Sequence, residues 1–312
     1  MPKQYRPYPA DPVQSVVSRN FVNRKLIADD AMHRIMPINK EEFKVTLEDF
    51  SLGITIPDTL VGARGVVNEV GGEASEMTLS TQDHALKDPI PQSHIDAAAG
   101  SKFNPVTRST EQLTNLILLD REVRVSNLMS NPANYLAANV VPLAAGSKFS
   151  DADFNPIPLI MDMLAVPLMR PNVLSFSEAA INALTMNPFI VKAAHGNSGD
   201  AGIASFEAIR KLFRVDKILV GEARVNVARK GQAADIKTAW GNNDVSMTYQ
   251  DTMADNRSGT TWGLSVPYKQ RIAMQWHDKK IGARGGTMVQ VVEGMAEVVI
   301  AKELGILLQN VI

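Results

Sequence analysis

The chain of 312 residues contains no cysteine. Disulfide bonds, thiolate metal sites and cysteine nucleophiles are therefore excluded together. An excess of one charge sign is also lacking, because 32 Lys and Arg face 33 Asp and Glu, so that nothing attracts a polyanion to the chain as a whole. No stretch approaches the roughly 18 apolar residues of a membrane span, and the proline-rich start lacks the apolar core of a signal peptide. We expect a soluble protein made in the cytosol.

Hydrophobic residues make up 45% of the chain and charged residues 21%, a composition typical of globular proteins with room for about two domains. The charges are unevenly distributed along the sequence. Residues 1–40 contain seven Lys or Arg and three Asp or Glu, a net charge of +4. Residues 41–100 contain three basic and eleven acidic residues, a net charge of −8. Two appendages of opposite sign therefore precede the first convincing core helix.

Neither appendage contains a useful length of helical pattern. Five prolines interrupt the basic arm, whereas Phe43, Val45 and Leu47 alternate as in a strand with one exposed face. Solvated loops are the simpler interpretation, but about a hundred residues with little core are too many for the loops of one compact domain. We therefore expect the arm and the acidic hairpin to pack on adjacent subunits, with opposite charge helping to set the register.

A long helix is predicted next, over residues 109–130. Ser109 and Gln112 resemble a capping box, and Asn131-Pro132 supplies the stop. The expected apolar face contains Leu113, Leu116, Ile117, Val123 and Leu128. The expected solvated face contains the alternating charges of Asp120, Arg121, Glu122 and Arg124. This helix would form a rod of roughly 33 Å.

Residues 154–226 run from a helix into a strand twice. The first unit is FNPIPLIMDMLAV followed by NVLSFS, the second is SFEAIRKLFRV followed by KILVGEA, and the helix SEAAINALTMNP lies between them. The apolar stripe of the second helix consists of Phe206, Ile209, Leu212 and Phe213. Enzymes of this build place glycines, carboxylates or histidines just past the strand end, but only GEA follows here. A structural or assembly role therefore competes well with catalysis.

Three further strands are predicted in the C-terminal part, from WGLSVPY, RIAMQWH and MVQVVEGMAEVVI. Glycine-rich turns separate them, and ELGILLQNVI closes the chain as a buried strand or a tail. All three tryptophans, Trp240, Trp262 and Trp276, lie in the last quarter. We expect them to anchor the sheet or an interface.

Candidates for metal binding and catalysis are sparse. The histidines are His33, His84, His94, His195 and His277, and they form no HExxH motif or close pair. A metal-ligand set of His84, Asp88 and His94 is conceivable, but solvated loop residues explain these positions better. The segment GNSGD at 196–200 does not satisfy the nucleophile motif GxSxG, and a flexible loop explains it.

Two short repeats could contact phosphate. AAGSKF occurs at 98–103 and 144–149, and GARG occurs at 62–65 and 282–285. Gly-Ser-Lys could form an anion nest, but without the full GxxxxGK[ST] pattern similar turns are the better explanation. We assign no catalytic residue, no cofactor, no cofactor-binding residue and no metal-binding residue.

A specific resemblance covers nearly the whole chain. The segments ITIPDTLVGARGVVNEVGGEA, HALKDPIP, LTNLILLDREVRVSNLM, NPANYLAANV, LAAGSKFSDADFNPIPLI, RPNVLSFSEAAINAL, LFRVDKILVGEARVN and GILLQNVI occur in this order. Their order and spacing resemble the major capsid protein of tailed double-stranded-DNA bacteriophages. The resemblance implies an α+β chain with the Hong-Kong-97-type capsid fold.

The resemblance also implies a division of the chain. It comprises an N-terminal arm at 1–40, an extended loop at 41–100, a peripheral domain from 101–150 and 255–297 with the spine helix 109–130, and an axial domain from 151–254 and 298–312. Some family members cross-link subunits through a Lys–Asn isopeptide bond. Lys87 or Lys44 could serve in such a bond, but the sequence singles out no asparagine or acid.

The implied function is structural and not enzymatic. Family subunits form hexamers and pentamers that tile an icosahedral shell around the genome, which places the chain in the virion after assembly in the bacterial cytoplasm. Expected partners are further copies, a separate scaffolding protein, a portal, a possible decoration protein, and packaged DNA through weak non-specific contact; no membrane is expected. The alternatives are the shell of a cellular nanocompartment and an α/β enzyme or small-molecule binder with an unrecognised site.

Overall fold

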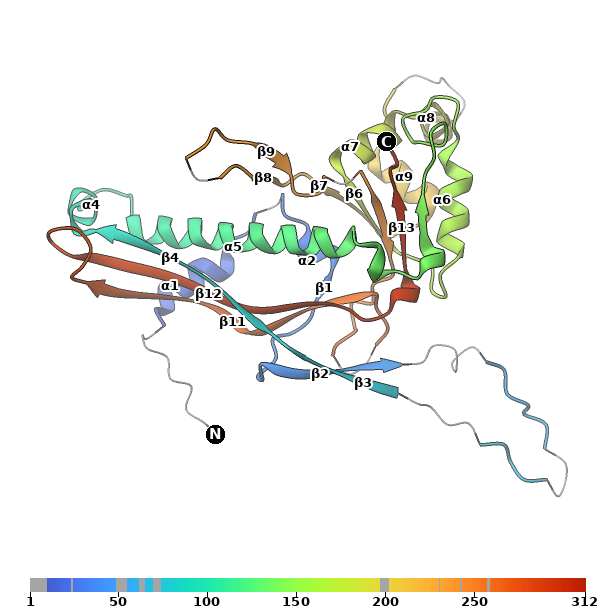
Figure 1. Cartoon of the computed structure of the whole chain (residues 1–312), viewed down its shortest axis with the longest axis horizontal. Coiled ribbons are helices and arrows are strands. Elements are labelled where there is room, and N and C mark those ends of the chain that lie inside the picture. The colour runs from blue at the N-terminus through green and yellow to red at the C-terminus, as the bar shows by residue number, and fades with distance from the viewer. Residues whose placement is uncertain are drawn as a thin grey trace.

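The computed structural model of the chain describes residues 10–23, 25–48, 55–61, 65–69, 74–196, 202–229, 231–241, 243–256 and 259–312. Figure 1 shows a compact unit at one end, a long helix beside an elongated sheet, and a two-stranded hairpin that projects away from both. Each of the two larger sheets contains antiparallel strand pairs and has helices packed beside it, which agrees with the expected α+β class.

The compact unit is built on a five-stranded sheet. In spatial order its strands are β5 (Val140–Pro142), β13 (Gly305–Gln309), β10 (Val245–Thr248), β6 (Val173–Ser177) and β7 (Lys217–Gly221). The helices of this unit are α6 (Pro156–Ala165), α7 (Glu178–Met186), α8 (Pro188–His195) and α9 (Phe206–Phe213). The strands that end the two predicted helix-to-strand units, β6 and β7, pair in parallel. The closing segment of the chain forms a buried strand and not a tail.

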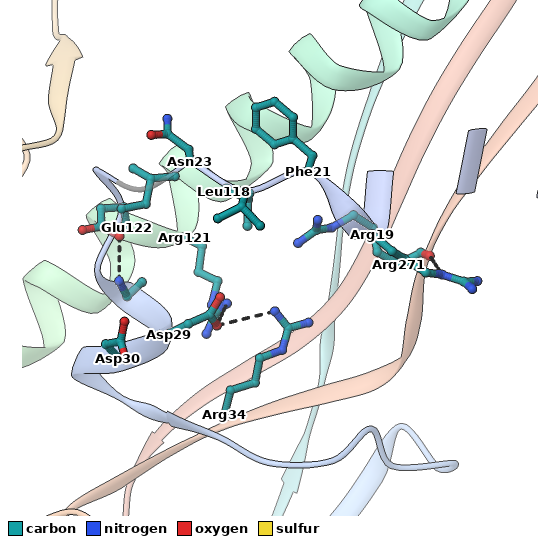
Figure 2. A pocket seen from close by; sticks show the side chains of 13 residues that line it. Arg19, Phe21, Asn23, Asp29, Asp30, Arg34, Leu118, Arg121, Glu122 and Arg271 are labelled. Atoms are coloured by element: carbon teal, nitrogen blue, oxygen red, sulfur yellow. Dashed lines mark hydrogen bonds and ion pairs between the residues drawn. The ribbon is translucent and has the colours of Figure 1, made fainter. Parts of the chain in front are cut away.

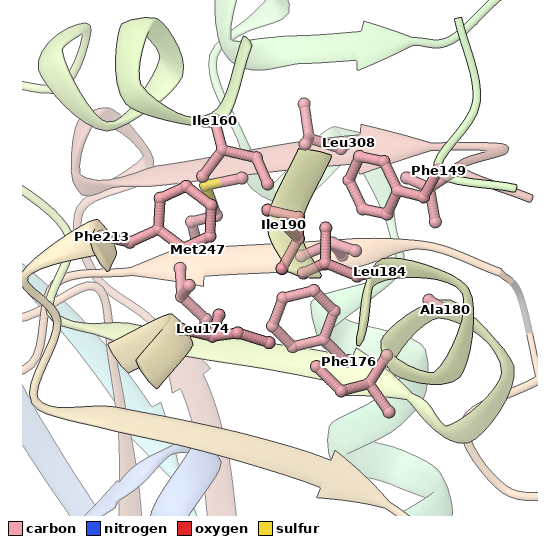
Figure 3. Close-up of a cluster of buried hydrophobic side chains, with 14 of the residues drawn as sticks. Phe149, Ile160, Leu174, Phe176, Ala180, Leu184, Ile190, Phe213, Met247 and Leu308 are labelled. Carbon is pink, nitrogen blue, oxygen red and sulfur yellow. The ribbon is translucent and has the colours of Figure 1, made fainter. Parts of the chain in front are cut away.

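The largest hydrophobic core lies between this sheet and its helices (Figure 3). Fully buried side chains from strands and helices meet there, among them Phe149, Ile160, Leu174, Phe176, Leu184, Ile190, Phe213, Met247 and Leu308. Burying one such side chain stabilises a fold by roughly 1.5–3 kcal/mol. The compact unit therefore carries a domain-sized core of its own.

Helix α9 follows the predicted apolar stripe except at its first residue. The Ser205 hydroxyl caps the helix by accepting a hydrogen bond from the Ala208 N–H at 3.2 Å. Ile209 and Phe213 are fully buried, as expected, whereas Phe206 is 52% exposed. The prediction for Phe206 is wrong because the helix begins there, and the side chain projects past the end of the core.

A second, elongated sheet has four strands. In spatial order they are β1 (His33–Arg34), β11 (Gly263–Asp278), β12 (Gly286–Val299) and β4 (Gln82–Pro91). The strands predicted from WGLSVPY and RIAMQWH join into the single strand β11, with a change of register between Tyr268 and Ile272. Strand β4 lies within the segment 41–100 that was expected to be an extended loop, so part of that segment belongs to this sheet.

The predicted spine is helix α5 (Pro105–Met129), which lies along the elongated sheet (Figure 1). Its N-cap is Asn104, whose side chain accepts from the N–H groups of Val106 and Thr107, so the predicted capping box at Ser109 is wrong. Ser109 lies one turn inside the helix and donates to Asp88 at 2.6 Å instead. The helix ends before Asn131-Pro132, as the sequence predicts.

The buried face of α5 differs from the predicted one. Leu113 and Ile117 are buried, but Leu116 is 42% exposed. Arg121 and Glu122, predicted on a solvated face, are 1% and 0% exposed. The face that meets the sheet repeats at intervals of three and four residues through Thr110, Leu113, Thr114, Ile117, Arg121, Val125 and Met129. Position on the helix thus places Arg121 inside despite its charge.

The described part of the basic arm, 10–23 and 25–40, is held by its own chain. It contains α1 (Pro12–Asn20), α2 (Ala28–Ala31) and β1, which pairs in parallel with β11. The hydroxyls of Ser18 and Thr114 lie 2.8 Å apart, which fixes α1 on the spine. In this part of the arm the docking surface is therefore the subunit's own sheet and spine helix.

The projecting hairpin consists of β2 (Glu42–Glu48) and β3 (Ala74–Ser80). Phe43 and Val45 are buried against Leu264 and Val266 of β11, which confirms the predicted alternation at these two positions. Beyond the hairpin, residues 55–61 and 65–69 form neither helix nor strand. The root of the hairpin is therefore fixed, and its distal part leaves the core.

The remaining elements are short. They are α4 (Gln92–Ala97), β8 (Arg224–Asn226), β9 (Ile236–Thr238) and the 3-10 turns η1 (Pro132–Asn134), η2 (Ala137–Asn139) and η3 (Lys302–Leu304). Trp240 and Trp262 are buried in a common cluster, and Trp262 stacks on Tyr135 with ring centroids 5.3 Å apart. These two tryptophans pack in one cluster with Leu307 of β13, in line with the expected anchoring of a sheet, whereas Trp276 is half-buried on β11.

Candidate assembly surfaces

The distal part of the projecting hairpin exposes aliphatic side chains. The most exposed are Ile56 at 92%, Leu60 at 84%, Val66 at 92% and Val67 at 68%. Single exposed apolar side chains are common, but a contiguous segment of them marks a surface that binds another macromolecule. We call residues 55–61 and 65–69 the distal loop. It is the strongest candidate for a contact with a second chain.

A second feature is a network of charges where the arm crosses the spine (Figure 2). The Asp29 carboxylate pairs with Arg121 of α5 and, at 3.4 Å, with Arg34 of β1. Arg34 also contacts Glu293 at 3.0 Å, and Glu293 binds Arg271 at 3.1 Å. Three arginines and two carboxylates therefore join the arm, the spine and the elongated sheet.

Glu122 fastens the arm at a neighbouring point. Its buried carboxylate accepts from the backbone N–H groups of Ile27 at 3.0 Å and Ala28 at 2.8 Å. It also accepts from the indole N–H of Trp240 at 2.7 Å. One side chain of the spine thus orders the arm and the segment that follows β9.

The two carboxylates of this region have opposite pKa shifts. Burial opposes the ionisation of Asp29, but the guanidinium groups of Arg121 and Arg34 outweigh it and hold the pKa of Asp29 below its usual value. Burial raises the pKa of Glu122 even though three N–H groups favour its ionised form. Asp29 is half exposed, so its ion pairs contribute less than fully buried ones would.

The possible metal-ligand set of the acidic hairpin does not assemble. His84 lies near Asp120 and Arg124, at 3.8 Å and 3.3 Å. Asp88, four residues further along β4, binds Ser109, and His94 belongs to α4. Across the described ranges, no three His, Asp or Glu side chains lie close enough to hold a metal ion.

The other motifs contribute no chemistry that the structure describes. Ser198 of GNSGD and three residues of the first GARG, 62–64, lie outside the described residues. Both AAGSKF segments form turns, as expected, and the second GARG is the turn between β11 and β12. In the described part of the chain, no helix combines the length and the hydropathy needed to cross a membrane.

Sequence reasoning missed Arg121, Glu122, Glu293 and Arg271 as functional positions. Their partners lie 22 to 259 positions away along the chain, so no local spacing reveals them. The one available signal is the position of Arg121 and Glu122 in the helical repeat, one turn after the buried Ile117. The general preference of charged side chains for the surface predicts the opposite placement for both residues.

Comparison with known proteins identifies the family. No family model matches the chain. The major capsid protein of Pseudomonas phage JBD67 is 40% identical over 306 residues, which cover 98% of each chain. The major capsid protein of Burkholderia phage BcepMu is 26% identical over 269 residues, covering 84% of this chain and 83% of that protein. These relatives are named as structural proteins and not as enzymes.

Solved structures show the same fold. A phage-related protein from Bordetella bronchiseptica superimposes with a TM-score of 0.76 at 19% identity, over 97% of this chain and 98% of that one. The capsid of the cyanophage P-SCSP1u superimposes with a TM-score of 0.57 at 9% identity, over 89% and 86%. The fold is the Hong-Kong-97-type capsid fold, and because a named relative is 40% identical along nearly its whole length, the chain belongs to the major capsid protein family of bacteriophages.

Proposed function

We propose that this chain assembles into hexamers and pentamers that tile an icosahedral head shell around double-stranded phage DNA. The observation that carries the proposal is the distal loop, which exposes Ile56, Leu60 and Val66 far from the subunit's own core. Burial of these three side chains on a neighbour would contribute roughly 1.5–3 kcal/mol each. Repeated around every subunit, contacts of this size would add up over a closed shell.

The proposed division of the chain into two domains follows the two larger sheets. The axial domain consists of 151–254 and 298–312, and the peripheral domain consists of 101–150 and 255–297. The pairing of β4 with β12 supports counting residues 82–91 with the peripheral domain, and the pairing of β5 with β13 supports counting 140–142 with the axial domain. The acidic extended loop then begins at the root of β2 and ends before β4.

The proposed partners are other copies first, then a scaffolding protein, a portal and a decoration protein. Assembly would take place in the cytoplasm of the host bacterium. Contact with packaged DNA would be weak and non-specific, because the chain carries a formal net charge of −1. Affinity of the shell for DNA should therefore change little with salt concentration, and a steep salt dependence would contradict this part of the proposal.

Electron microscopy and gel filtration of the purified chain test the proposal. Closed shells, tubes or isolated capsomers are the expected result, and particles purified from infected cells should protect DNA from nuclease. A stable small oligomer with a saturable small-molecule ligand would overturn the proposal. Particles filled with an enzyme and free of DNA would assign the chain to nanocompartment shells instead.

A further inference from the structure

Strand β11 is interrupted near its middle. We call its residues 268–272 the bulge, because within it three residues stand opposite one residue of β12, Glu293. Lys269 has a φ of 54°, a left-handed conformation that costs free energy for a residue with a side chain. Gly294 pairs with Tyr268 so closely that an added Cβ would lie 3.0 Å from the Tyr268 Cβ. The regular ladder of the elongated sheet is therefore broken at the bulge.

The arm supplies hydrogen-bond partners to the backbone of the bulge. The Lys269 N–H donates to the Ile38 carbonyl at 2.9 Å. From α1, Nε of Arg19 donates to the Arg271 carbonyl at 3.0 Å (Figure 2), and Nη1 of Arg271 donates to the Ser18 carbonyl at 2.9 Å. Backbone groups that lack a regular partner on β12 are thus satisfied by the arm.

The arm is anchored to β11 on both sides of the bulge. Before the bulge, β1 pairs with β11 at Leu264 and Ser265. After it, the Ser15 hydroxyl accepts from the Ala273 N–H at 3.0 Å and donates to the Ala273 carbonyl at 3.2 Å. The Asp11 N–H donates to the same carbonyl at 2.9 Å. The arm therefore bridges the bulge from one half of the strand to the other.

The two halves of β11 belong to separate hydrophobic clusters. Before the bulge, Leu264 and Val266 pack with the root of the projecting hairpin. After it, Ala273 packs in another cluster with Leu113 and Ile117 of the spine. The spine helix lies on β12 and β4, whereas α1 lies on β11 (Figure 1). Along the bulged strand itself, the arm is therefore the element that connects the two halves.

We propose that the bulge is a hinge in β11 and that the arm holds this hinge in one shape. With the arm docked, both halves of the strand are fixed to one segment. When α1 detaches, the bulge loses its partners from the arm, and the two halves can change their relative angle. A partner that displaces α1 would thereby alter the elongated sheet. This inference does not depend on shell assembly, since every contact lies within one subunit.

Hydrogen–deuterium exchange of the full-length, unassembled chain tests this coupling, measured residue by residue with mass spectrometry. Ser15→Ala removes the hydroxyl that binds Ala273 and leaves the bond between Lys269 and Ile38 in place. Exchange of the amides in the bulge, that of Lys269 included, should become about threefold faster or more. Faster exchange that is confined to Ala273 and its neighbours, with an unchanged rate at Lys269, would overturn the proposal.

Ser246→Ala is the matched control for this experiment. Ser15 and Ser246 are both 4% exposed, and the Ser246 hydroxyl lies 2.8 Å from that of Tyr135 in the compact unit, where the arm has no anchor. The control should leave exchange at the bulge unchanged. Equal acceleration by the two variants would overturn the proposal, because a general loss of stability would then explain it.

A second matched pair uses exposed residues and decides the question if Ser15→Ala does not fold. Arg19 donates to the Arg271 carbonyl at 3.0 Å, and Arg170 donates to the Phe213 carbonyl of the compact unit at 2.8 Å. Arg19→Gln should accelerate exchange at Lys269 about twofold or more, because it removes one bond between α1 and the bulge. Arg170→Gln should leave that rate unchanged. Equal rates at Lys269 in the two variants would overturn the proposal.

Discussion

The buried carboxylate of Glu122 accepts hydrogen bonds from two separate parts of the chain. Its two carboxylate oxygens satisfy the first N–H groups of α2, which has no side-chain cap of its own, and the indole N–H of Trp240. Buried N–H groups without an acceptor are costly, so this carboxylate replaces the missing cap from a different part of the chain. A residue of the spine thus decides whether the arm can form its short helix.

Replacing Glu122 with Gln should therefore destabilise the subunit. The amide keeps one acceptor oxygen but turns an N–H donor toward groups that are themselves donors, and we expect a loss of about 2–3 kcal/mol in the free energy of unfolding. Urea denaturation followed by tryptophan fluorescence measures it. Glu178→Gln, which removes only an exposed ion pair with Arg224, is the control and should cost less than about 1 kcal/mol. Similar losses of stability in both variants would refute the role of Glu122 as the acceptor for these three N–H groups.

Asp244 gives a second prediction at this scale. It accepts a hydrogen bond from the Asn310 N–H at 3.2 Å, and burial raises its pKa to about 6. Because the folded pKa lies above the unfolded value, the folded state binds more protons between about pH 4 and 6, and stability falls as the pH rises through this window. Asp244→Asn removes this titration.

The stability of Asp244→Asn relative to the unmodified chain should thus increase from about pH 4 to pH 6 and then level off. After allowance for solvent screening of a partly exposed group, the increase should be about 1–2 kcal/mol. Urea denaturation at several pH values measures it, with the exposed Asp153→Asn as control. A difference that stays flat across the window would show that burial does not perturb Asp244.

In the spine helix, the position of a residue on the helix decides whether its side chain is buried, whatever the polarity of that side chain. Helix α5 has 25 residues, and the side that meets the sheet includes Arg121 and Glu122 between aliphatic positions. The exposed Leu116 lies on the opposite side. Helical geometry fixes this pattern, because residues three and four positions apart share a face.

A pair of adjacent substitutions tests the orientation of the spine. Ile117→Asp buries an unpaired carboxylate next to the core of the elongated sheet and should cost about 3 kcal/mol or more. Leu116→Asp changes an exposed site and should cost about 1 kcal/mol or less. Denaturation midpoints and soluble yield measure the difference, and an equal cost for the two would show that the helix is rotated.

The sequence predicts helices and strands well where apolar residues recur at the spacing of the element and those same residues are buried. The stripe of α9 and the apolar run of β7 are examples, since Ile209 and Phe213 occupy the positions that the period indicates. The predicted start of α5 is wrong because Asn104 and Ser109 are both residue types that cap helices well, and only tertiary packing selects Asn104. The charge network could not be predicted, since Asp29 and Arg121 are brought together by tertiary packing alone.

At the scale of the whole molecule, two kinds of surface are kept apart. The described arm residues, 10–23 and 25–40, dock on the subunit's own sheet and spine helix, whereas the distal loop is carried outward on the hairpin β2–β3 (Figure 1). Antiparallel pairing holds the two strands of that hairpin together, and the exposed side chains of Lys44 and Glu76 form an ion pair across them. The proposed assembly contact and the contacts that fold the subunit thus involve different residues, and we expect mutation to separate them.

The double substitution Ile56→Ser and Val66→Ser should separate them. Both side chains are 92% exposed in the subunit, so the melting temperature of the unassembled chain should change by less than about 1 °C. Loss of two buried aliphatic contacts per subunit should abolish or strongly reduce particle formation, measured by electron microscopy and sedimentation. The control is Ile203→Ser, 69% exposed next to α9 and away from the distal loop. Normal particle yield from the double variant would exclude the distal loop as an assembly contact.

The docking of α1 on β11 has a consequence for biosynthesis. The Ser15 hydroxyl donates to the Ala273 carbonyl, 258 positions later in the chain. At about 5–20 residues per second, a ribosome needs roughly 10–50 s to make the intervening segment. Throughout that interval α1 cannot pack on β11, because β11 has not yet been synthesised. The nascent chain is therefore exposed to chaperones and proteases until translation is almost complete. The subunit therefore completes the docking of its arm only when its last strands emerge, at the end of its synthesis.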